Sequence, residues 1–270
     1  MKPGLEDLVL GPGSTPAISQ ELRFRWEDSQ RQVRVLFAGV TIAKSTRVMR
    51  LQEFGYLPVY YFPLEDVRKD VLEKTDHHTY SPLKGEASYW TIRIGDNVAE
   101  NAAWSYLNPL PDGPQLQDYV AFYWDKMEAW YEEDEQVFAH ARDPYKRVDI
   151  LPSSRHVRVV LRGETIADTH HPHMLLETGL PIRYYIPEQE IRMEHFEATE
   201  TITRCPYKGK ASYWSANVGG KMFKDIMWSY RETLPASSPI HGLFCFFNER
   251  VDAIYVDGEL MPKPRTPWSE

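Results

Sequence analysis

The chain has 270 residues, of which 42% are hydrophobic and 26% charged, and its formal net charge is −8 at pH 7. This composition is ordinary for a globular protein, and the length allows two domains that each bury a core. It excludes a membrane span, because no run of about 18 apolar residues occurs, and the negative charge disfavours nucleic acid or anionic lipid as a partner.

The first predicted elements in chain order follow a lead-in, residues 1–32, that lacks the apolar core of a signal peptide. Alternation in "VRVLF" (33–37) and the turn at Ala38-Gly39 predict a hairpin with "VTIA" (40–43). A short strand is expected in "LPVYYF" (57–62). "PLEDVRKDVLEK" (63–74) predicts a short helix, since proline stands near its start and acidic residues fill its first turn.

The next segments again predict strands. Residues 86–106, "EASYWTIRIGDNVAENAAWSY", indicate two strands around a Gly-Asp-Asn turn. Residues 119–133, "YVAFYWDKMEAWYEE", indicate a final hairpin that turns at Asp125-Lys126. Together these elements predict a compact antiparallel β domain with one short helix.

The same pattern returns 124 positions later without a gap, from residue 33 to about residue 135. "VRVLFAGVTIA" (33–43) faces "VRVVLRGETIA" (157–167), and "SPLKGEASYW" (81–90) faces "CPYKGKASYW" (205–214). A constant offset over such a length indicates two copies of one domain. We therefore predict a first domain at 33–139, a linker at 140–156, a second domain at 157–262 and a C-terminal tail at 263–270.

The motifs of the second copy resemble a known family. "V-R-V…G…I-A-D", "E-T-G-L-P-x-R-Y-Y-x-P" (177–187), "C-P-Y-K-G-x-A-S-Y-W" and "W-S-Y" are similar to the DUF427 family, also labelled NTP_transf_9. "DPYKRVDILPSSRHV" (143–157) resembles members with tandem copies. The resemblance implies a mainly β chain of two tandem antiparallel β-tent-like (Mss4-like) domains, in which sheets lean together over a cleft.

The resemblance alone does not imply a metal site or a nucleotide substrate in this chain. Relatives of this fold often hold zinc through cysteines, but the chain lacks paired CxxC motifs, so we expect no metal and no cofactor. The family label suggests nucleotidyl transfer, yet there is no P-loop, no phosphate-type glycine loop and no paired Asp motif for Mg²⁺.

Two charged positions occur in both copies. Glu177 follows the apolar "MLL" and corresponds to Glu53, so we expect these carboxylates to be partly buried and to need a partner. Lys208, which corresponds to Lys84, precedes a glycine turn and could reach that carboxylate. The pair is either a structural ion pair or an acid–base or carboxylate-binding couple.

Aromatic side chains suggest the walls of a cleft. Tyr213 and Tyr230 each stand beside a Trp, and neighbours on a strand point to opposite faces, so one of each pair should face the cleft or solvent. A tyrosine hydroxyl there could donate a hydrogen bond to a substrate oxygen. Arg183 corresponds to Val59 and is not needed by the shared fold, so it is a candidate clamp for a carboxylate.

The differences between the copies favour the second domain as the working site, with the first as scaffold or lid. The second keeps Cys205, Tyr207 and Arg183 where the first has Ser81, Leu83 and Val59. Cys205 has no histidine in a recognisable arrangement, so it is interpreted as a structural thiol rather than a nucleophile. Two cysteines make no disulfide framework and indicate a reducing, cytoplasmic location.

The predicted site has two groups of residues and no metal ligand. The catalytic group is Glu177, Lys208, Tyr213 and Arg183. The substrate-binding group is Tyr185, Trp228, Tyr230 and Cys205, with Glu53, Lys84, Tyr89, Trp104 and Tyr106 from the first copy. The expected partner is a small-molecule substrate, and the expected state is a monomer or homodimer.

Three functions remain open. The first is a cofactor-independent enzyme that uses acid–base catalysis on a small oxygen-rich metabolite, for example to cyclise, lactonise or isomerise a polyketide-like substrate in secondary metabolism. Glu177 would act as acid or base, Lys208 and Arg183 would stabilise an enolate or carboxylate, and the tyrosines would orient it. The second is a non-catalytic module that binds a metabolite or protein. The third is the nucleotidyltransferase of the family label.

Overall fold

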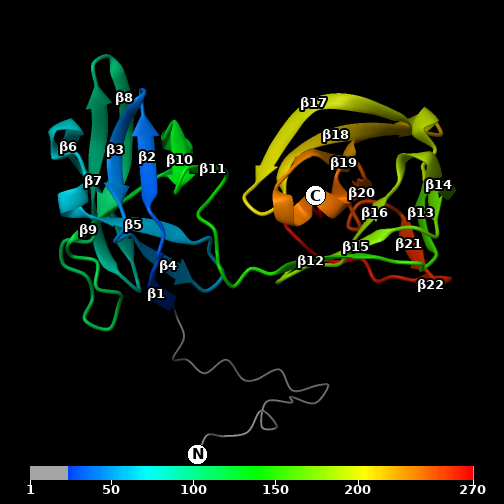
Figure 1. The fold of residues 1–270 in the computed structure, drawn as a ribbon, viewed down its shortest axis with the longest axis horizontal. Coiled ribbons are helices and arrows are strands. Elements are labelled where there is room, and N and C mark those ends of the chain that lie inside the picture. The colour runs from blue at the N-terminus through cyan, green and yellow to red at the C-terminus, as the bar shows by residue number, and fades with distance from the viewer. Residues whose placement is uncertain (1–23, 270) are drawn as a thin grey trace, which may run out of the picture. The chain divides into compact units, whose positions relative to one another are not determined.

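The computed structural model describes residues 24–269. The chain is mainly β, and its described strands form four antiparallel sheets arranged as two similar halves (Figure 1). It divides into two compact units, one containing residues 42–123 and the chain up to Val33, the other containing residues 34–41 and the chain from Trp124 onward. Within residues 24–269 the helical elements are short 3₁₀ turns, and none is long and apolar enough to cross a membrane.

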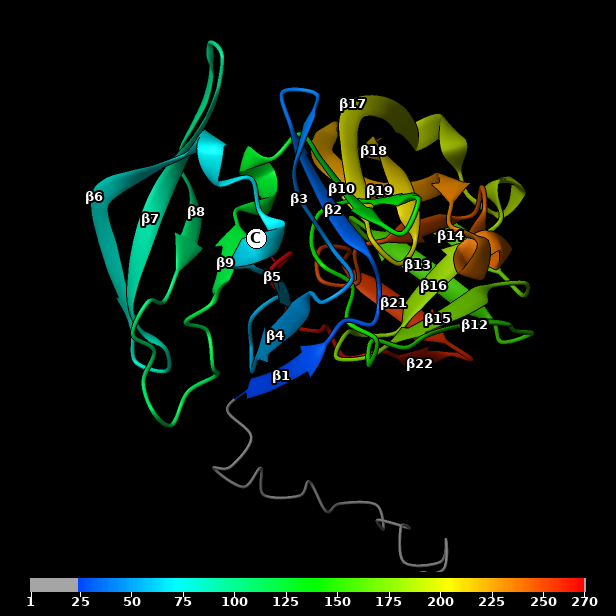
Figure 2. The same cartoon turned by 60° about the vertical axis from the view of Figure 1, so that its left-hand side comes forward.

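The first half has a large sheet and a small one. The seven-stranded sheet has the order β1 (Phe24–Asp28), β4 (Met49–Glu53), β5 (Val59–Pro63), β9 (Tyr119–Phe122), β8 (Asn97–Ser105), β7 (Gly85–Ile94), β6 (Leu72–Ser81). The four-stranded sheet has the order β11 (Glu135–Val137), β10 (Ala129–Glu132), β2 (Val33–Phe37), β3 (Val40–Ser45). Figure 2 shows β6, β7 and β8 side by side as a long ladder.

The second half repeats both sheets. Its seven-stranded sheet has the order β12 (Val148–Pro152), β15 (His173–Glu177), β16 (Arg183–Ile186), β20 (Phe244–Phe246), β19 (Lys221–Thr233), β18 (Gly209–Val218), β17 (Phe196–Cys205). Its four-stranded sheet has the order β14 (Glu164–Thr169), β13 (Val157–Leu161), β21 (Ala253–Val256), β22 (Glu259–Leu260). The order is the same in both halves, as the constant offset predicts.

Strand register assigns the side chains of the large sheet to two faces. Tyr185 pairs with Cys245, Cys245 with Trp228, and Trp228 with Tyr213 across four neighbouring strands. Directly paired residues share a face and sequence neighbours alternate. The Tyr213 face therefore carries these four residues, while Trp214 lies on the opposite face, where its ring packs edge-on against Phe244.

Two equivalent loop residues close the tyrosine face in the two halves. Leu116 lies between β8 and β9, and Ile240 ends the 3₁₀ turn η7 (Pro235–Ile240); both are 0% exposed. Leu116 belongs to one buried cluster with Tyr61, Tyr89 and Tyr106, and η7 packs on β19 and β12. The tyrosine face is thus a second hydrophobic core, closed by a loop.

The predicted helix at 63–74 is wrong. The segment forms two 3₁₀ turns, η2 (Leu64–Asp66) and η3 (Lys69–Val71), and β6 already begins at Leu72. Val67 between the turns is extended and bridges to Ala43, and it is 6% exposed. Burial and pairing of this residue outweigh the helical start signals. The second half repeats the pattern with η5 (Glu188–Glu190) and η6 (Met193–His195).

The predicted hairpin at 119–133 is also wrong, although both of its strands exist. β9 pairs with β5 and β8, whereas β10 pairs within the four-stranded sheet. The 3₁₀ turn η4 (Trp124–Lys126) carries the chain from one sheet to the other. The hairpins predicted at 33–43 and 86–106 are confirmed as β2–β3 and β7–β8.

Two strands lie where the sequence indicated only connecting chain. β1, in the predicted lead-in, pairs with β4 over five residues, and β12, in the predicted linker, pairs with β15 over five residues. Each forms one edge of a large sheet. Residues 1–23 of the predicted lead-in lie outside the described residues.

Candidate functional site

Glu177 and Lys208 meet as expected. Glu177 ends β15, and Lys208 stands in the turn between β17 and β18; the Lys208 Nζ forms an ion pair with the Glu177 Oε2. The two side chains are 5% and 11% exposed, respectively. Two charges at such depth need each other, because an unpaired buried charge is strongly unfavourable.

The first half builds the same couple closer to the surface. The Lys84 Nζ forms an ion pair with the Glu53 Oε1, and these side chains are 12% and 19% exposed. The Lys84 ammonium lies 5.5 Å from the centroid of the Tyr106 ring. A repeated couple in equivalent turns shows that both halves hold a carboxylate and an ammonium together at this end of the large sheet.

Residues 140–147, here called the covering segment, lie against the couple in the second half. The Lys146 Nζ is 3.6 Å from the Glu177 Oε1 and donates to the Thr178 carbonyl at 2.6 Å. The Asp143 N–H donates to the Tyr207 hydroxyl at 2.7 Å. The covering segment thus adds a second cation to Glu177, and it explains why this couple is the less exposed of the two.

Two titratable rings accompany the covering segment. His140 packs against Tyr207 with ring centroids 5.9 Å apart. Burial lowers the pKa of His140, so its imidazole is neutral at neutral pH, and burial raises the pKa of Tyr207 to about 12. His140 and Lys146 were not predicted as site residues, because both lie in the segment interpreted as a linker. The signal available for Lys146 was "DPYKRVDILP" (143–152), which formed part of the family resemblance; His140 precedes this stretch.

The predicted aromatic cleft is mostly core. Tyr185, Trp228 and Tyr230 are 1%, 7% and 6% exposed, and the Trp228 Nε1 donates to the Tyr185 hydroxyl at 3.1 Å. Burial raises the pKa of Tyr185 and of Tyr230 well above the ordinary value. Alternation correctly separates Tyr213 from Trp214, but the same prediction for Tyr230 is wrong, because Trp228 lies two residues before it and shares its face. Alternation also cannot foresee that a loop covers the tyrosine face.

Tyr213 is the second-half tyrosine of this face that is only partly buried. Its hydroxyl lies 2.8 Å from the Thr203 Oγ1, and burial raises the pKa of the phenol. In the first half the Tyr89 hydroxyl lies 2.8 Å from the Thr79 Oγ1, and the Trp104 Nε1 donates to the Tyr61 hydroxyl at 3.3 Å. The polar anchoring of these rings is therefore common to both halves.

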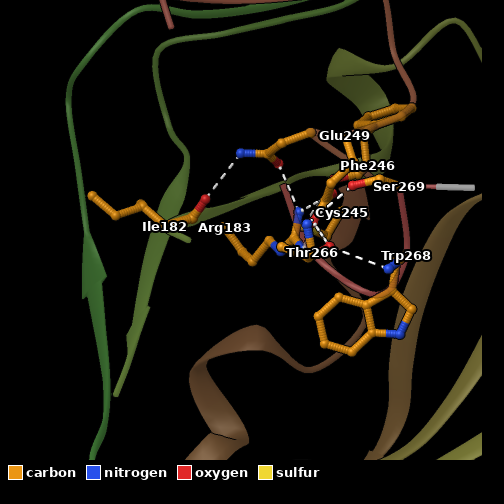
Figure 3. A network of polar contacts seen from close by, with 9 residues as sticks. Ile182, Arg183, Cys245, Phe246, Glu249, Thr266, Trp268 and Ser269 are labelled. Atoms are coloured by element: carbon orange, nitrogen blue, oxygen red, sulfur yellow. Dashed lines mark hydrogen bonds and ion pairs between the residues drawn. The ribbon is translucent and has the colours of Figure 1, made fainter. Parts of the chain in front are cut away.

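Arg183 does not offer the free guanidinium that the sequence suggested. Its Nη1 and Nη2 donate to the two carboxylate oxygens of Glu249 at 2.7 and 2.6 Å (Figure 3). The Thr266 hydroxyl also donates to Glu249, at 2.6 Å, and the indole of Trp268 lies 5.9 Å from the guanidinium carbon. The C-terminal tail therefore completes the surroundings of this buried pair.

The Arg183 charge is stabilised internally. Burial opposes the charge, but hydrogen bonds to Glu249 outweigh it and raise the pKa of Arg183. Burial likewise opposes ionisation of Glu249, and hydrogen bonds from Arg183 and Thr266 hold its pKa below the ordinary value. A bidentate pair of this kind leaves no fork for a substrate carboxylate, so the predicted clamp is corrected to a structural ion pair.

The cysteines and histidines do not assemble a metal site in the described chain. Cys205 and Cys245 are free; Cys245 is fully buried, which raises its pKa to about 12, whereas Cys205 is partly exposed. His170 stacks on His156 and His171 contacts Glu190. Among residues 24–269 no three His, Cys, Asp or Glu side chains are grouped so that they could hold a metal ion.

Comparison with protein families gives a twofold match. The family described as "Domain of unknown function (DUF427)", NTP_transf_9, matches residues 25–133 and again residues 149–257. The chain belongs to the DUF427 family. Each match takes in one of the unforeseen edge strands, β1 or β12. No curated protein matches the chain.

Proposed function

We propose that this DUF427 protein is a cofactor-independent enzyme that performs acid–base chemistry on a small oxygen-rich metabolite at the Glu177–Lys208 couple. The observation that carries the proposal is the couple itself, which both halves form at the same place. Buried ion pairs contribute little to net stability, whereas buried acid–base pairs are frequent at functional sites. Free cysteines are consistent with a cytoplasmic location.

The roles follow from the geometry of the second half. Glu177 moves the proton, and the ammonium groups of Lys208 and Lys146, on its two oxygens, stabilise charge that develops on a substrate oxygen. Carbon–carbon cyclisation and isomerisation of a polyketide-like chain move protons between carbon and oxygen. Lactonisation moves a proton from the attacking hydroxyl to the oxygen that leaves as water, and none of the three needs a redox step. Because the covering segment contacts the couple, substrate entry requires that this segment move aside.

Arg183 and the buried aromatic residues take supporting roles in this proposal. Arg183 and Glu249 tie the start of β16 to the turn that follows β20, and Tyr185, Trp228 and Tyr230 form the apolar floor. Tyr213, partly exposed and bound to Thr203, remains the tyrosine that could orient a substrate oxygen.

A non-catalytic binding module is the second candidate. It is favoured by the internal satisfaction of Arg183 and by the closed tyrosine face, both of which leave few groups free for chemistry. The two candidates differ in what Glu177 does. In an enzyme its charge and proton are needed for turnover, whereas in a binding module they affect affinity alone.

The test compares wild-type protein with Glu177→Gln and, as a control, Glu73→Gln, which removes a surface carboxylate paired with Arg93 in the first half. Each is incubated with a small-molecule extract of the source organism, and all metabolites are followed by untargeted mass spectrometry. We expect wild type and Glu73→Gln to convert a metabolite, and Glu177→Gln to bind the same metabolite while its turnover falls by about 10²–10⁴-fold.

Two outcomes contradict the enzyme proposal. If wild type retains a metabolite through native mass spectrometry but converts none, the protein is a binding module. If Glu177→Gln is folded and turns over as fast as wild type, the couple is structural and the site lies elsewhere.

A further inference from the structure

A cavity of about 200 Å³ opens beside the turn between β17 and β18, within the second compact unit. It is lined by Gln136, Phe138, Arg142, Arg204, Cys205, Pro206, Gly209, Lys210, Glu232, Thr233 and Leu234. Neither Glu177 nor Lys208 lines it. Its volume is below the roughly 300–1,000 Å³ of pockets for drug-sized ligands, so its occupant is small.

Three cations line the cavity, and two of them are already occupied. Arg142 forms an ion pair with Glu135 and donates its Nε–H to the Pro206 carbonyl at 3.0 Å. The Lys210 Nζ lies 2.7 Å from the Glu232 Oε1. These contacts fix both side chains and leave little of their charge for a ligand.

Arg204 is the cation that remains available. Its guanidinium carbon lies 4.1 Å from the centroid of the Phe138 ring. Within residues 24–269 its side chain makes no ion pair and no hydrogen bond, although its charge helps to lower the pKa of Glu232, which lines the same cavity. Stacking on an aromatic face holds a guanidinium in place without using its N–H donors. The guanidinium of Arg204 is therefore held in place at the cavity, and its N–H groups make no hydrogen bond within the described chain.

The rest of the lining is largely apolar. Phe138, Pro206 and Leu234 supply hydrocarbon surface, and Cys205 supplies a partly exposed, free thiol. Such a wall favours the apolar body of a ligand, while the guanidinium favours its anionic end.

We propose that this cavity binds a small organic carboxylate, with the carboxylate on Arg204 and the hydrocarbon part between Phe138, Leu234 and the Cys205 thiol. A planar fork that binds two oxygens selects a carboxylate over a simple halide. The inference stands apart from the acid–base proposal, because Arg204, which would bind the carboxylate, has no part in that proposal, and neither Glu177 nor Lys208 lines the cavity.

The rate at which Cys205 is alkylated reports on ligand binding in the cavity, when two reagents of nearly equal size but different charge are compared. Iodoacetate is anionic and iodoacetamide is neutral, and both react with a thiolate by displacing iodide. Cys245 is fully buried and stays silent. We expect the iodoacetate-to-iodoacetamide rate ratio at Cys205, read by intact mass, to exceed that of glutathione about fivefold, because a cation at contact range stabilises the anionic reagent.

The variants assign that preference to Arg204. Arg204→Gln should bring the ratio down to the glutathione value, while Arg93→Gln, which removes a surface arginine paired with Glu73 in the other half, should leave it unchanged. Hexanoate should slow alkylation of wild type, and hexanamide, its uncharged counterpart, should not.

Equal ratios in wild type and Arg204→Gln overturn the proposal. Ligand-observed NMR of hexanoate and hexanamide provides a readout independent of the thiol. If hexanoate broadens no more with wild type than with Arg204→Gln, the cavity does not bind carboxylates. Since Arg204 is exposed, the variant should keep the wild-type melting temperature, which a thermal melt verifies.

Discussion

Gly85 and Gly209 occupy equivalent positions, directly after the lysine of each Glu–Lys couple. Both have a positive φ, +93° and +113°. A Cβ on Gly85 would lie 3.4 Å from the Asn108 carbonyl oxygen, whereas one on Gly209 would lie 2.1 Å from the Glu232 carbonyl oxygen. The two halves thus share a backbone constraint and differ in the space around it.

We expect Gly209→Ala to destabilise the protein more than Gly85→Ala. The positive φ should cost each variant about 1–2 kcal/mol. Gly209→Ala must in addition displace the backbone of β19, which should bring its loss to about 4 kcal/mol or more. Urea unfolding monitored by circular dichroism measures both, and equal losses would show that the β18–β19 pairing yields easily.

The candidate site was only partly predictable at the level of single residues. Glu177 and Lys208 could be paired because both recur at the same offset and because a carboxylate after "MLL" needs a partner. The pairing of Arg183 could not be predicted, since its partner Glu249 is 66 positions away and corresponds to Asp125, opposite Val59, in the first copy. Because this ion pair is present in only one of the two copies, comparing the copies could not reveal it.

At the level of elements, the loops over the tyrosine faces contribute more to the stability of the fold than their irregular sequences suggest. Leu116 and Ile240 are 124 positions apart, and each is completely buried in a loop. Each holds closed a face that carries tyrosines and a tryptophan. Without this side chain, an apolar gap would open next to the tyrosine hydroxyl groups of that face.

Leu116→Ala and Ile240→Ala should each destabilise the protein by about 3 kcal/mol, because a large buried side chain leaves a cavity that the sheet cannot close. Leu107→Ala is the control from the same loop as Leu116; its side chain is 42% exposed, so we expect a loss below about 0.5 kcal/mol. Chemical denaturation measures all three. If the losses of unfolding free energy were near the control value, the loops would contact the sheets without stabilising them.

Elements could be predicted where local pattern and pairing agree. The hairpins β2–β3 and β7–β8 join strands that are neighbours in both chain and sheet. The segment after Pro63 has helical start signals, but the bridge from Val67 to Ala43 keeps it extended. β9 and β10 are consecutive strands in different sheets, a choice made by tertiary packing and invisible to local alternation.

At the scale of the whole molecule, the repeat indicates two domains, and the family match begins earlier in each copy than the internal similarity does. The internal similarity begins at residue 33 in the first copy, whereas the family match begins at residue 25 and includes β1. β1 and β12 differ in sequence, "FRWED" against "VDILP", so they contribute nothing to self-similarity. They are edge strands with one paired side, which tolerates more variety than a central strand.

This extension predicts how fragments of the second half behave. A fragment of residues 157–262, the boundary given by self-similarity, lacks β12, the covering segment and Thr266. It exposes the free edge of β15 and removes one hydrogen bond from the buried Glu249. We expect it to aggregate or to unfold without a cooperative transition, whereas residues 138–270 should fold and melt cooperatively.

A third fragment, residues 138–262, separates the contribution of the tail from that of β12. Deletion of the tail removes the Thr266 hydrogen bond to a carboxylate, worth about 1.5–3 kcal/mol when buried, but leaves Arg183 paired with Glu249. This fragment should therefore fold, and its melting temperature should be lower than that of the fragment 138–270. Cooperative melting of 157–262 at the same temperature as 138–270 would show instead that β12 and the tail are appended to a domain that is complete without them.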